Sequence, residues 1–248
     1  MILRKIRFVY NEPALIINTN KEKYLVVGDL HIGLERRLSE KGIRVLNATD
    51  FMVYKLKKIM GEFSLSNLII LGDVKDSILY PEISDTRLIK SFFDELKDFD
   101  VRIIAGNHDA HLDEILNVET DREYVLGEFG FLHGDKKPDE ETMLCNYILT
   151  AHNHATIRMR DKNGAVYEEK VWIVADVVSR GAGGLYKDFN KNTKLIVLPA
   201  FNDLIMGTAI SREQQSRNPL FKNRVFDYRH SKFYTLRGEQ IELKKQGF

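Results

Sequence analysis

The sequence has a single cysteine, Cys145, almost no net charge and no long apolar run. One cysteine excludes a disulfide within the chain and a metal site built of thiolates, and it is typical of a reducing compartment. A formal charge of +1 excludes the strong basic footprint of a dedicated nucleic-acid-binding module, although a local basic patch remains open. Because no run approaches the length of a membrane span, and charges interrupt the N-terminal segment, we expect a cytoplasmic protein without a membrane partner.

The 248 residues, of which 44% are hydrophobic, are enough to bury one large α/β core. The sequence shows no repeat, low-complexity segment or interdomain linker. We therefore predict one domain over residues 1–248, with residues 199–248 as a C-terminal extension packed on it.

Five short apolar runs, rich in β-branched residues, have the length and composition of strands buried on both faces. Each leads directly into polar residues, and the five runs end before Gly28, Gly72, Gly106, His133 and His152. Helical patterns at 51–60 and 88–96 separate the first three runs, as parallel strands require. Because the carboxyl ends of parallel strands meet at one edge of a sheet, these polar residues should converge on one cleft.

Residues 6–17 have the pattern of a hairpin at the sheet edge. Residues 167–178 and 194–198 have the pattern of strands in a second sheet, and residues 232–236 and 240–243 that of a terminal hairpin. Together with the helices, they predict a four-layer α/β/β/α architecture.

The polar residues after the strands are nitrogen and oxygen ligands. Asp29 and His31 are separated by one residue, so that in an extended strand end both point the same way. Asp73 can bridge two ions. The full candidate set is Asp29, His31, Asp73, Asn107, His133, His152 and His154. Such mixed ligands suit Mn, Fe, Zn, Co or Ni better than calcium, and paired ions about 3.5 to 4 Å apart are a recurrent solution for displacement at phosphorus.

The motif series of these residues resembles that of the calcineurin-like metallophosphoesterase superfamily. The motifs occur in the family's order, with Ala151 where the family usually has Gly, and they are Asp29-Leu-His31, Gly72-Asp73, Gly106-Asn-His-Asp109, His133 and Ala151-His-Asn-His154. The resemblance implies two divalent ions, with Mn expected first. It gives one ion to Asp29, His31, Asp73 and His154, and the other to Asp73, Asn107, His133 and His152.

The resemblance also implies a role for His108 as the non-ligand that contacts the phosphate and assists the leaving group. We expect Asp109 to orient the His108 imidazole or to raise its pKa. Asp76 and Asp135 are candidates for fixing the orientation of ligand histidines, with simple capping as the alternative.

A weaker resemblance concerns substrate. Leu198-Pro-Ala-Phe201, followed by Gly207, is similar to the C-terminal signature of the ICC-like phosphoesterase subgroup, some of whose bacterial members accompany a DNA ligase and act as DNA-damage-response endonucleases. This makes a phosphodiester in DNA or RNA the leading expectation. The alternatives are a phosphomonoesterase or nucleotide hydrolase with the same metal core, and a non-catalytic scaffold, which the complete ligand set disfavours.

Three further features stay open at this stage. His111 is close enough in sequence to line the cleft, Arg180 could bind phosphate, and the glycine-rich turn 181–184 lacks the spacing of a phosphate-binding loop. The metal identity and the oligomeric state, with a homodimer among the options, also stay open.

Overall fold

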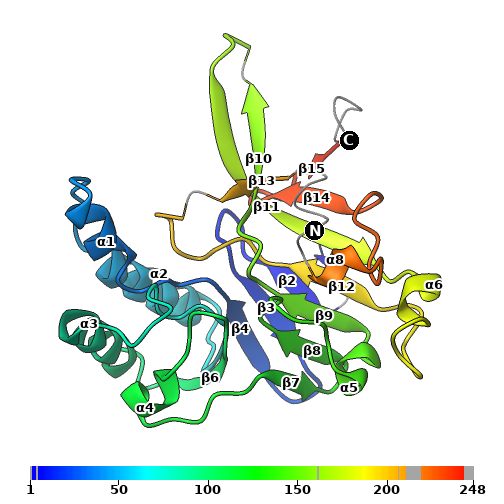
Figure 1. Ribbon diagram of the computed structural model, residues 1–248, viewed down its shortest axis with the longest axis horizontal. Coiled ribbons are helices and arrows are strands. Elements are labelled where there is room, and N and C mark those ends of the chain that lie inside the picture. The colour runs from blue at the N-terminus through cyan, green and yellow to red at the C-terminus, as the bar shows by residue number, and fades with distance from the viewer. Residues whose placement is uncertain (1, 4, 161, 206, 211–218, 243–248) are drawn as a thin grey trace.

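The computed structural model describes residues 2, 3, 5–160, 162–205, 207–210 and 219–242. Two β-sheets lie face to face, and helices cover the outer face of each sheet (Figure 1). The predicted α/β/β/α order of layers is confirmed.

The first sheet has six strands in chain order, and its three carboxyl-terminal strands are parallel. These strands are β1 (Ile2–Leu3), β2 (Ile6–Phe8), β3 (Leu15–Asn18), β4 (Lys23–Val27), β5 (Asn67–Leu71) and β6 (Asp100–Ile104). Strands β2 and β3 pair in antiparallel fashion, which confirms the predicted hairpin.

The second sheet is larger and mixed. In spatial order, its main path is β13 (Thr208–Ala209), β10 (Ala155–Arg160), β11 (Val166–Asp176), β12 (Lys194–Val197), β9 (Tyr147–Thr150), β8 (Phe129–Leu132) and β7 (Glu123–Leu126). Off this path, β14 (Lys232–Thr235) pairs with β11 and with β15 (Gln240–Ile241). Strands β8, β9 and β12 are parallel, so their carboxyl ends lie at the same edge.

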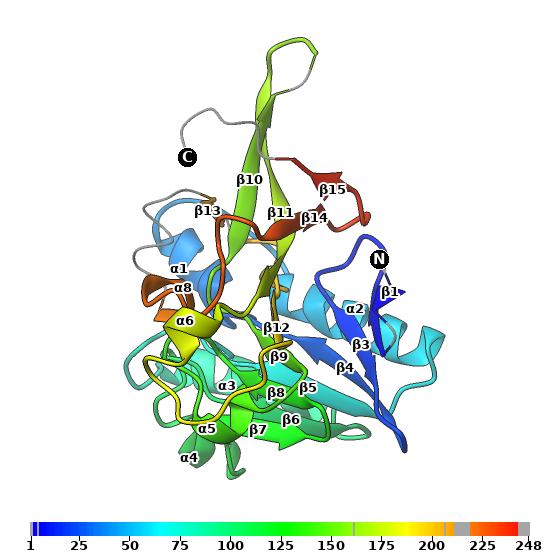
Figure 2. The same ribbon diagram turned by 90° about the vertical axis from the view of Figure 1, so that its right-hand side faces the viewer.

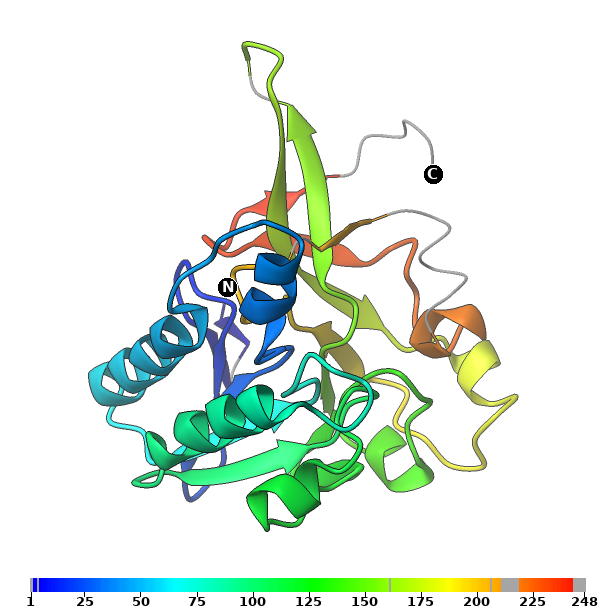
Figure 3. The same cartoon turned by 60° about the vertical axis from the view of Figure 1, so that its left-hand side comes forward.

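Except for α1, which packs against Ala200 and Ile205, the helices form the two outer layers (Figure 3). They are α1 (Leu34–Glu40), α2 (Ala48–Glu62), α3 (Ile83–Asp94), α4 (Leu112–Leu116), α5 (Glu140–Met143), α6 (Ser179–Ala182) and α8 (Pro219–Lys222). Helices α2, α3 and α4 pack on the first sheet, whereas α5, α6 and α8 pack on the second. Helix α6 occupies the start of the expected glycine-rich turn.

Strand alternation explains the layers. In β4, Leu25 and Val27 face the helices, whereas Val26 between them faces the second sheet. In β11, Trp172 and Val174 face the first sheet, and Val171 and Ile173 face the outer helices. Each sheet is therefore apolar on both faces over the part that is covered.

Strands β10 and β11 form a hairpin that projects beyond the other elements of the fold (Figures 1 and 2). Strand β14 and the start of β15 agree with the predicted terminal hairpin, but residue 243 lies outside the described residues. The same holds for residues 211–218 and 243–248 of the expected C-terminal extension, and the division of the chain into domain and extension stays a prediction. Within the described residues, none of the helices has the length and apolar character needed to span a bilayer.

A matched leucine pair tests the apolar layer between the sheets. Leu149 of β9 is fully buried there, whereas Leu144, a few residues earlier, is 55% exposed. Leu149→Ala should lower the free energy of unfolding by about 2–5 kcal/mol, because it removes buried methyl groups and leaves a cavity. Leu144→Ala should change it by about 0.5 kcal/mol or less. Urea denaturation of both variants measures the difference, and equal losses would contradict the assigned layer.

Candidate metal centre

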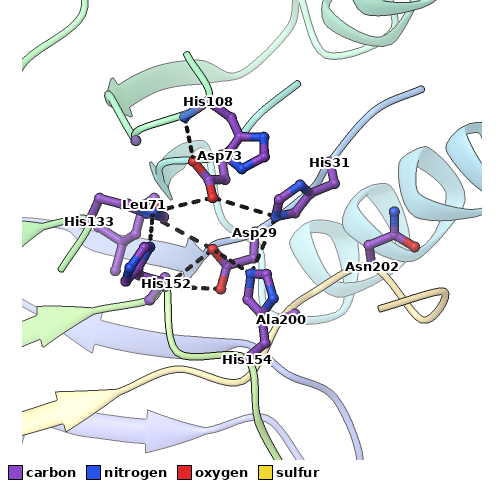
Figure 4. A network of polar contacts seen from close by, with 12 residues as sticks. Asp29, His31, Leu71, Asp73, His108, His133, His152, His154, Ala200 and Asn202 are labelled. Carbon is purple, nitrogen blue, oxygen red and sulfur yellow. Dashed lines mark hydrogen bonds and ion pairs between the residues drawn. The ribbon is translucent and has the colours of Figure 1, made fainter. Parts of the chain in front are cut away.

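The candidate ligands other than Asn107 converge where the carboxyl ends of the parallel strands of both sheets meet (Figure 4). Asp29 and His31 follow β4, Asp73 follows β5, and His108 follows β6 from the first sheet. The second sheet supplies the other side of the site: His133 after β8, and His152 and His154 after β9.

One group of side chains comes from three strand ends. Asp29, His31, Asp73 and His154 each offer an atom, and these atoms all lie within 4.8 Å of one another. The Nε2 atoms of His31 and His154 are 3.2 Å apart. His154 Nε2 lies 3.4 Å from Asp29 Oδ1, and His31 Nε2 lies 3.5 Å from Asp73 Oδ2.

A second group shares Asp73 with the first. It contains Asp73, His133 and His152, again with one atom from each residue within 4.8 Å of the others. His133 Nε2 lies 3.4 Å from Asp73 Oδ2 and 3.0 Å from His152 Nδ1. The same carboxylate oxygen of Asp73 thus faces a histidine of each group. This set of nitrogen and oxygen donors, with a carboxylate common to both groups, suits divalent metal binding.

Five of the predicted ligands have a left-handed backbone conformation. Asp29, His31, Asp73, His152 and His154 all have positive φ, between 43° and 68°. Asp29 and His31 therefore do not have the extended backbone that was expected from the sequence, but both side chains still reach the same group of ligand atoms. Such conformations cost free energy and cluster at functional sites. Here, loop-to-loop backbone bonds stabilise them, among them Asp29 N to Gly72 O at 3.1 Å and His31 N to Asp73 O at 2.8 Å.

Polar contacts of Nδ1 orient the rings of two candidate histidines. His133 Nδ1 donates to the carbonyl of Leu71 at 2.9 Å, which leaves Nε2 without a proton in the neutral ring and directed at Asp73. His31 Nδ1 lies 3.4 Å from a carboxylate oxygen of Asp76. Arg37 holds that carboxylate with two nitrogens, at 2.8 and 2.9 Å. Asp76 is thus placed where the sequence suggested, beside a ligand histidine.

Asp109 has a different environment from the one expected. Its buried carboxylate accepts backbone N–H bonds from Val74 at 2.8 Å, Lys75 at 3.2 Å and Gly106 at 2.8 Å. The contact that orients His108 comes instead from the Asp76 carbonyl, 2.7 Å from His108 Nδ1. Asp109 therefore ties the loop after β5 to the loop after β6.

The loop after β6 lies against Asp73. The N–H of His108 donates to Asp73 Oδ1 at 3.0 Å. A Cβ atom at Gly106 would collide with the Asp73 carboxylate, which explains why glycine stands there. Asn107 follows on this loop with its side chain exposed, and its place as a ligand stays a prediction.

Protons on histidines balance the charge of the buried carboxylates in this site. Burial alone would raise the pKa of Asp29 and Asp73, but neighbouring histidines outweigh it and lower both. Burial alone would lower the pKa of His133, but Asp73 and Asp29 outweigh it and raise that pKa to about 9. The pKa of His152 is lowered by burial and by the charge of His133. Divalent cations would replace these protons as the counter-charge of the two carboxylates.

Sequence reasoning missed the support given by residues 198–207. The N–H of Phe201 donates to Gly28 O at 2.9 Å, and the Asn202 side-chain amide donates to Leu30 O at 2.7 Å, on either side of Asp29. A Cβ atom at Gly207 would collide with the His154 carbonyl. In the sequence, the Leu198-Pro-Ala-Phe201 segment and Gly207 indicate only a substrate class. In the structure, they pack against the loops that carry Asp29 and His154.

His111, Asp135 and Arg180, whose roles the sequence left open, belong to neither of the two groups. His111 begins α4, with its ring 3.0 Å from Glu114 Oε1 and against the ring of Tyr80. Asp135 lines a cavity of about 250 Å³ next to His133, where its carboxylate is 3.9 Å from Lys136. Arg180 lies on α6, in the outer layer of the second sheet.

A family model and one solved structure agree with this fold. The model of the calcineurin-like phosphoesterase family matches residues 22–205. Nuclease MPE of Pseudomonas putida has a similar structure over 94% of this chain and 97% of its own, with 17% identity and a TM-score of 0.57. YfcE, a phosphoesterase from E. coli, is similar over 56% and 73%, with 15% identity and a TM-score of 0.35. A search of curated proteins gives no match.

The raised pKa of His133 gives a pH dependence with a definite sign. The His133 contribution to stability is fully present below the ordinary histidine pKa of 6.5 and is lost as the pH rises through about 9. In metal-stripped protein, we expect this part of the free energy of unfolding to fall by roughly 3 kcal/mol over that window.

Denaturation of metal-stripped protein at a series of pH values checks this. The His133→Asn variant should show a shallower slope between pH 6.5 and 9, and an unchanged slope would contradict the assignment. Calorimetric titration with Mn²⁺ should show tighter binding as the pH rises, because metal must displace the proton.

Proposed function

This chain belongs to the calcineurin-like phosphoesterase family, and within that family we propose that it hydrolyses phosphodiesters, with a nucleic-acid strand as substrate. The family and the cluster of acidic and histidine side chains make it a metal-dependent phosphoesterase. The observation that supports metal-assisted hydrolysis of a phosphate ester is the single oxygen of Asp73 that faces both ligand groups. The likeness in fold to a nuclease over nearly the whole chain supports the diester substrate.

The proposed centre holds two divalent ions, with Mn²⁺ expected first. One ion would take Asp29, His31, Asp73 and His154; the other would take Asp73, Asn107, His133 and His152. When bound, such ions activate water and neutralise charge on phosphate oxygens. Asp73, 2% exposed, and Asp29, fully buried, supply negative charge that suits cations in this position.

The chain's own residues keep this centre in one geometry. Leu71 and Asp76 orient His133 and His31, so that each ring presents Nε2 toward Asp73. Asp109 fixes the loop that carries His108 through three backbone bonds. We assign Asp109 a positioning role on this basis.

His108 is the proposed acid for the leaving oxygen. Its Nδ1 is held by the Asp76 carbonyl at 2.7 Å, which leaves Nε2 as the ring atom able to give a proton to the substrate. Its ring lies 5.0 Å from the ring of His31, centroid to centroid, so it borders the ligand groups. A general acid in this position contributes about 10²- to 10⁴-fold to the rate.

The test of the proposed function compares substrates. Metal-stripped protein refilled with Mn²⁺ should hydrolyse bis(p-nitrophenyl) phosphate faster than p-nitrophenyl phosphate, and should cleave labelled DNA or RNA. The Asp73→Asn variant should lose both bound metal and activity, because the carboxylate shared by the two groups is gone. Monoester-only activity would indicate a phosphatase or nucleotide hydrolase, and inactivity with every divalent metal would indicate a scaffold.

Replacement of His108 tests its role separately. His108→Asn should keep the metal content and lower kcat for the diester by about 10²- to 10⁴-fold. His111→Asn is the matched control, since that ring is exposed and bonded to Glu114, and it should stay close to the parent rate. Unchanged turnover of the His108 variant with intact metal content would remove the proposed acid.

A further inference from the structure

The hairpin of β10 and β11 continues the second sheet past the edge of the first. We call Ala155–Arg160 and residues 166–170 the arm. Within it, β10 pairs with β11 in the register Thr156–Lys170, Arg158–Glu168 and Arg160–Val166. The pairing of β11 with β12 and β14 begins only at Val171, so the outer part of the arm is a two-stranded ribbon. All three views show it projecting from the body (Figures 1, 2 and 3).

The inner face of the arm changes character where the first sheet ends. Trp172 and Val174 pack on the first sheet in the apolar layer. On the same face, further along the arm, the alternation places Lys170, then Glu168 with Arg158, then Arg160. The opposite face stays apolar at its base, where Ile157 and Met159 belong to the outer core. Among the described residues, this face has no opposing strand of the first sheet. It carries three basic residues, one acidic residue, Thr156 and Val166, and its Lys170 also lies 3.4 Å from Asp203 Oδ1.

This inner face lies on the side of the metal centre. The arm starts at the residue after His154, and Lys170 Nζ donates to Ala200 O at 2.7 Å and to Asn202 O at 2.8 Å. Asn202 in turn bonds the backbone at Leu30, next to Asp29. Figure 4 shows Ala200 and Asn202 beside the ligand groups. The basic positions thus extend outward from the centre along a single face.

Two arginines on this face are open to solvent. The side chain of Arg158 is 67% exposed, with one nitrogen 3.1 Å from Glu168 Oε1, and Arg160 donates to Gly164 O at 3.1 Å. A guanidinium has five N–H donors, so each arginine keeps donors for an oxyanion. An isolated two-stranded ribbon is only marginally stable. The exposed arginines therefore do not serve to stabilise a packed core.

We propose that the inner face of the arm binds the phosphate backbone of a nucleic-acid strand whose scissile phosphate lies at the metal centre. Arg158 and Arg160 contact phosphates beyond the scissile one, and the arm selects a polymer over a small diester. This inference rests on the proposed function. It places a local basic surface on a chain whose overall charge is close to zero.

The test is the double variant Arg158→Ala with Arg160→Ala, measured by anisotropy of a labelled single-stranded DNA at a series of salt concentrations. We expect affinity to fall about tenfold, and the slope of log K against log salt to become shallower by about 1.4, since each phosphate contact in a single strand contributes about 0.7. The kcat/KM for the DNA should fall about tenfold relative to that for bis(p-nitrophenyl) phosphate. The same measurements with RNA of equal sequence show whether the sugar matters.

Two matched variants keep the result specific. Lys21→Ala with Lys23→Ala removes the same charge from exposed positions at the opposite end of β4, and it should leave affinity and salt slope unchanged. Arg158→Lys with Arg160→Lys keeps the charge and should restore most of the affinity.

Several outcomes would overturn the inference. One is parent-like DNA affinity in the Arg158→Ala, Arg160→Ala variant, and another is an equal loss of affinity in the Lys21→Ala, Lys23→Ala control. A third is a change in sedimentation without a change in DNA binding, which would assign the arm to contact with a second copy. Absence of any diester hydrolysis by the parent protein would instead count against the proposed function, and it is measured in a separate assay.

Discussion

The site depends on the burial of two carboxylates, Asp29 and Asp73, at the junction of two sheets. A buried carboxylate is costly unless it is hydrogen-bonded and paired with opposite charge. Backbone N–H groups of His152 and His108 supply the hydrogen bonds, and ring nitrogens surround the remaining oxygens. Neither sheet alone brings these groups together, so the apolar layer between the sheets is also what assembles the centre.

The left-handed backbone at five ligand positions follows from the same constraint. Each strand must end and turn sharply for its side chain to reach a point shared with the other sheet. The conformational cost is offset by bonds between loops, with Asp109 tying the loops after β5 and β6 and Asn202 bracing the loop after β4. These two residues touch no ligand atom through their side chains, yet they set where Asp73 and Asp29 stand.

The sequence predicts the parts of this arrangement that are local. Apolar runs followed by Asp, His or Asn indicate which strand ends meet, because parallel strands share an edge, and residues 51–60 and 88–96 show the period of a helix. The conformation of His31 and the partner of Asp109 are not local properties. They depend on which loop lies opposite, and in the same way Thr49 of α2 bonds Glu35 of α1, a contact between two helices that the sequence pattern does not indicate. Asn202 is found only once the fold brings residue 202 beside residue 30.

The inward-facing positions of β11 are apolar from Trp172 onward and charged at Lys170 and Glu168. The change occurs where the first sheet ends. From Trp172 onward the inward positions face another sheet, so apolar side chains gain by burial. Lys170 faces the loop carbonyls of Ala200 and Asn202 instead of a strand, and further out Arg158 and Arg160 are exposed. A further apolar run there would leave an exposed ribbon prone to pairing with other chains. Charged residues avoid that hazard, but residues of mixed sign would do so equally well. The excess of basic residues on the face beside the carboxylate-rich centre is the feature that solubility leaves unexplained and that an anionic polymer explains.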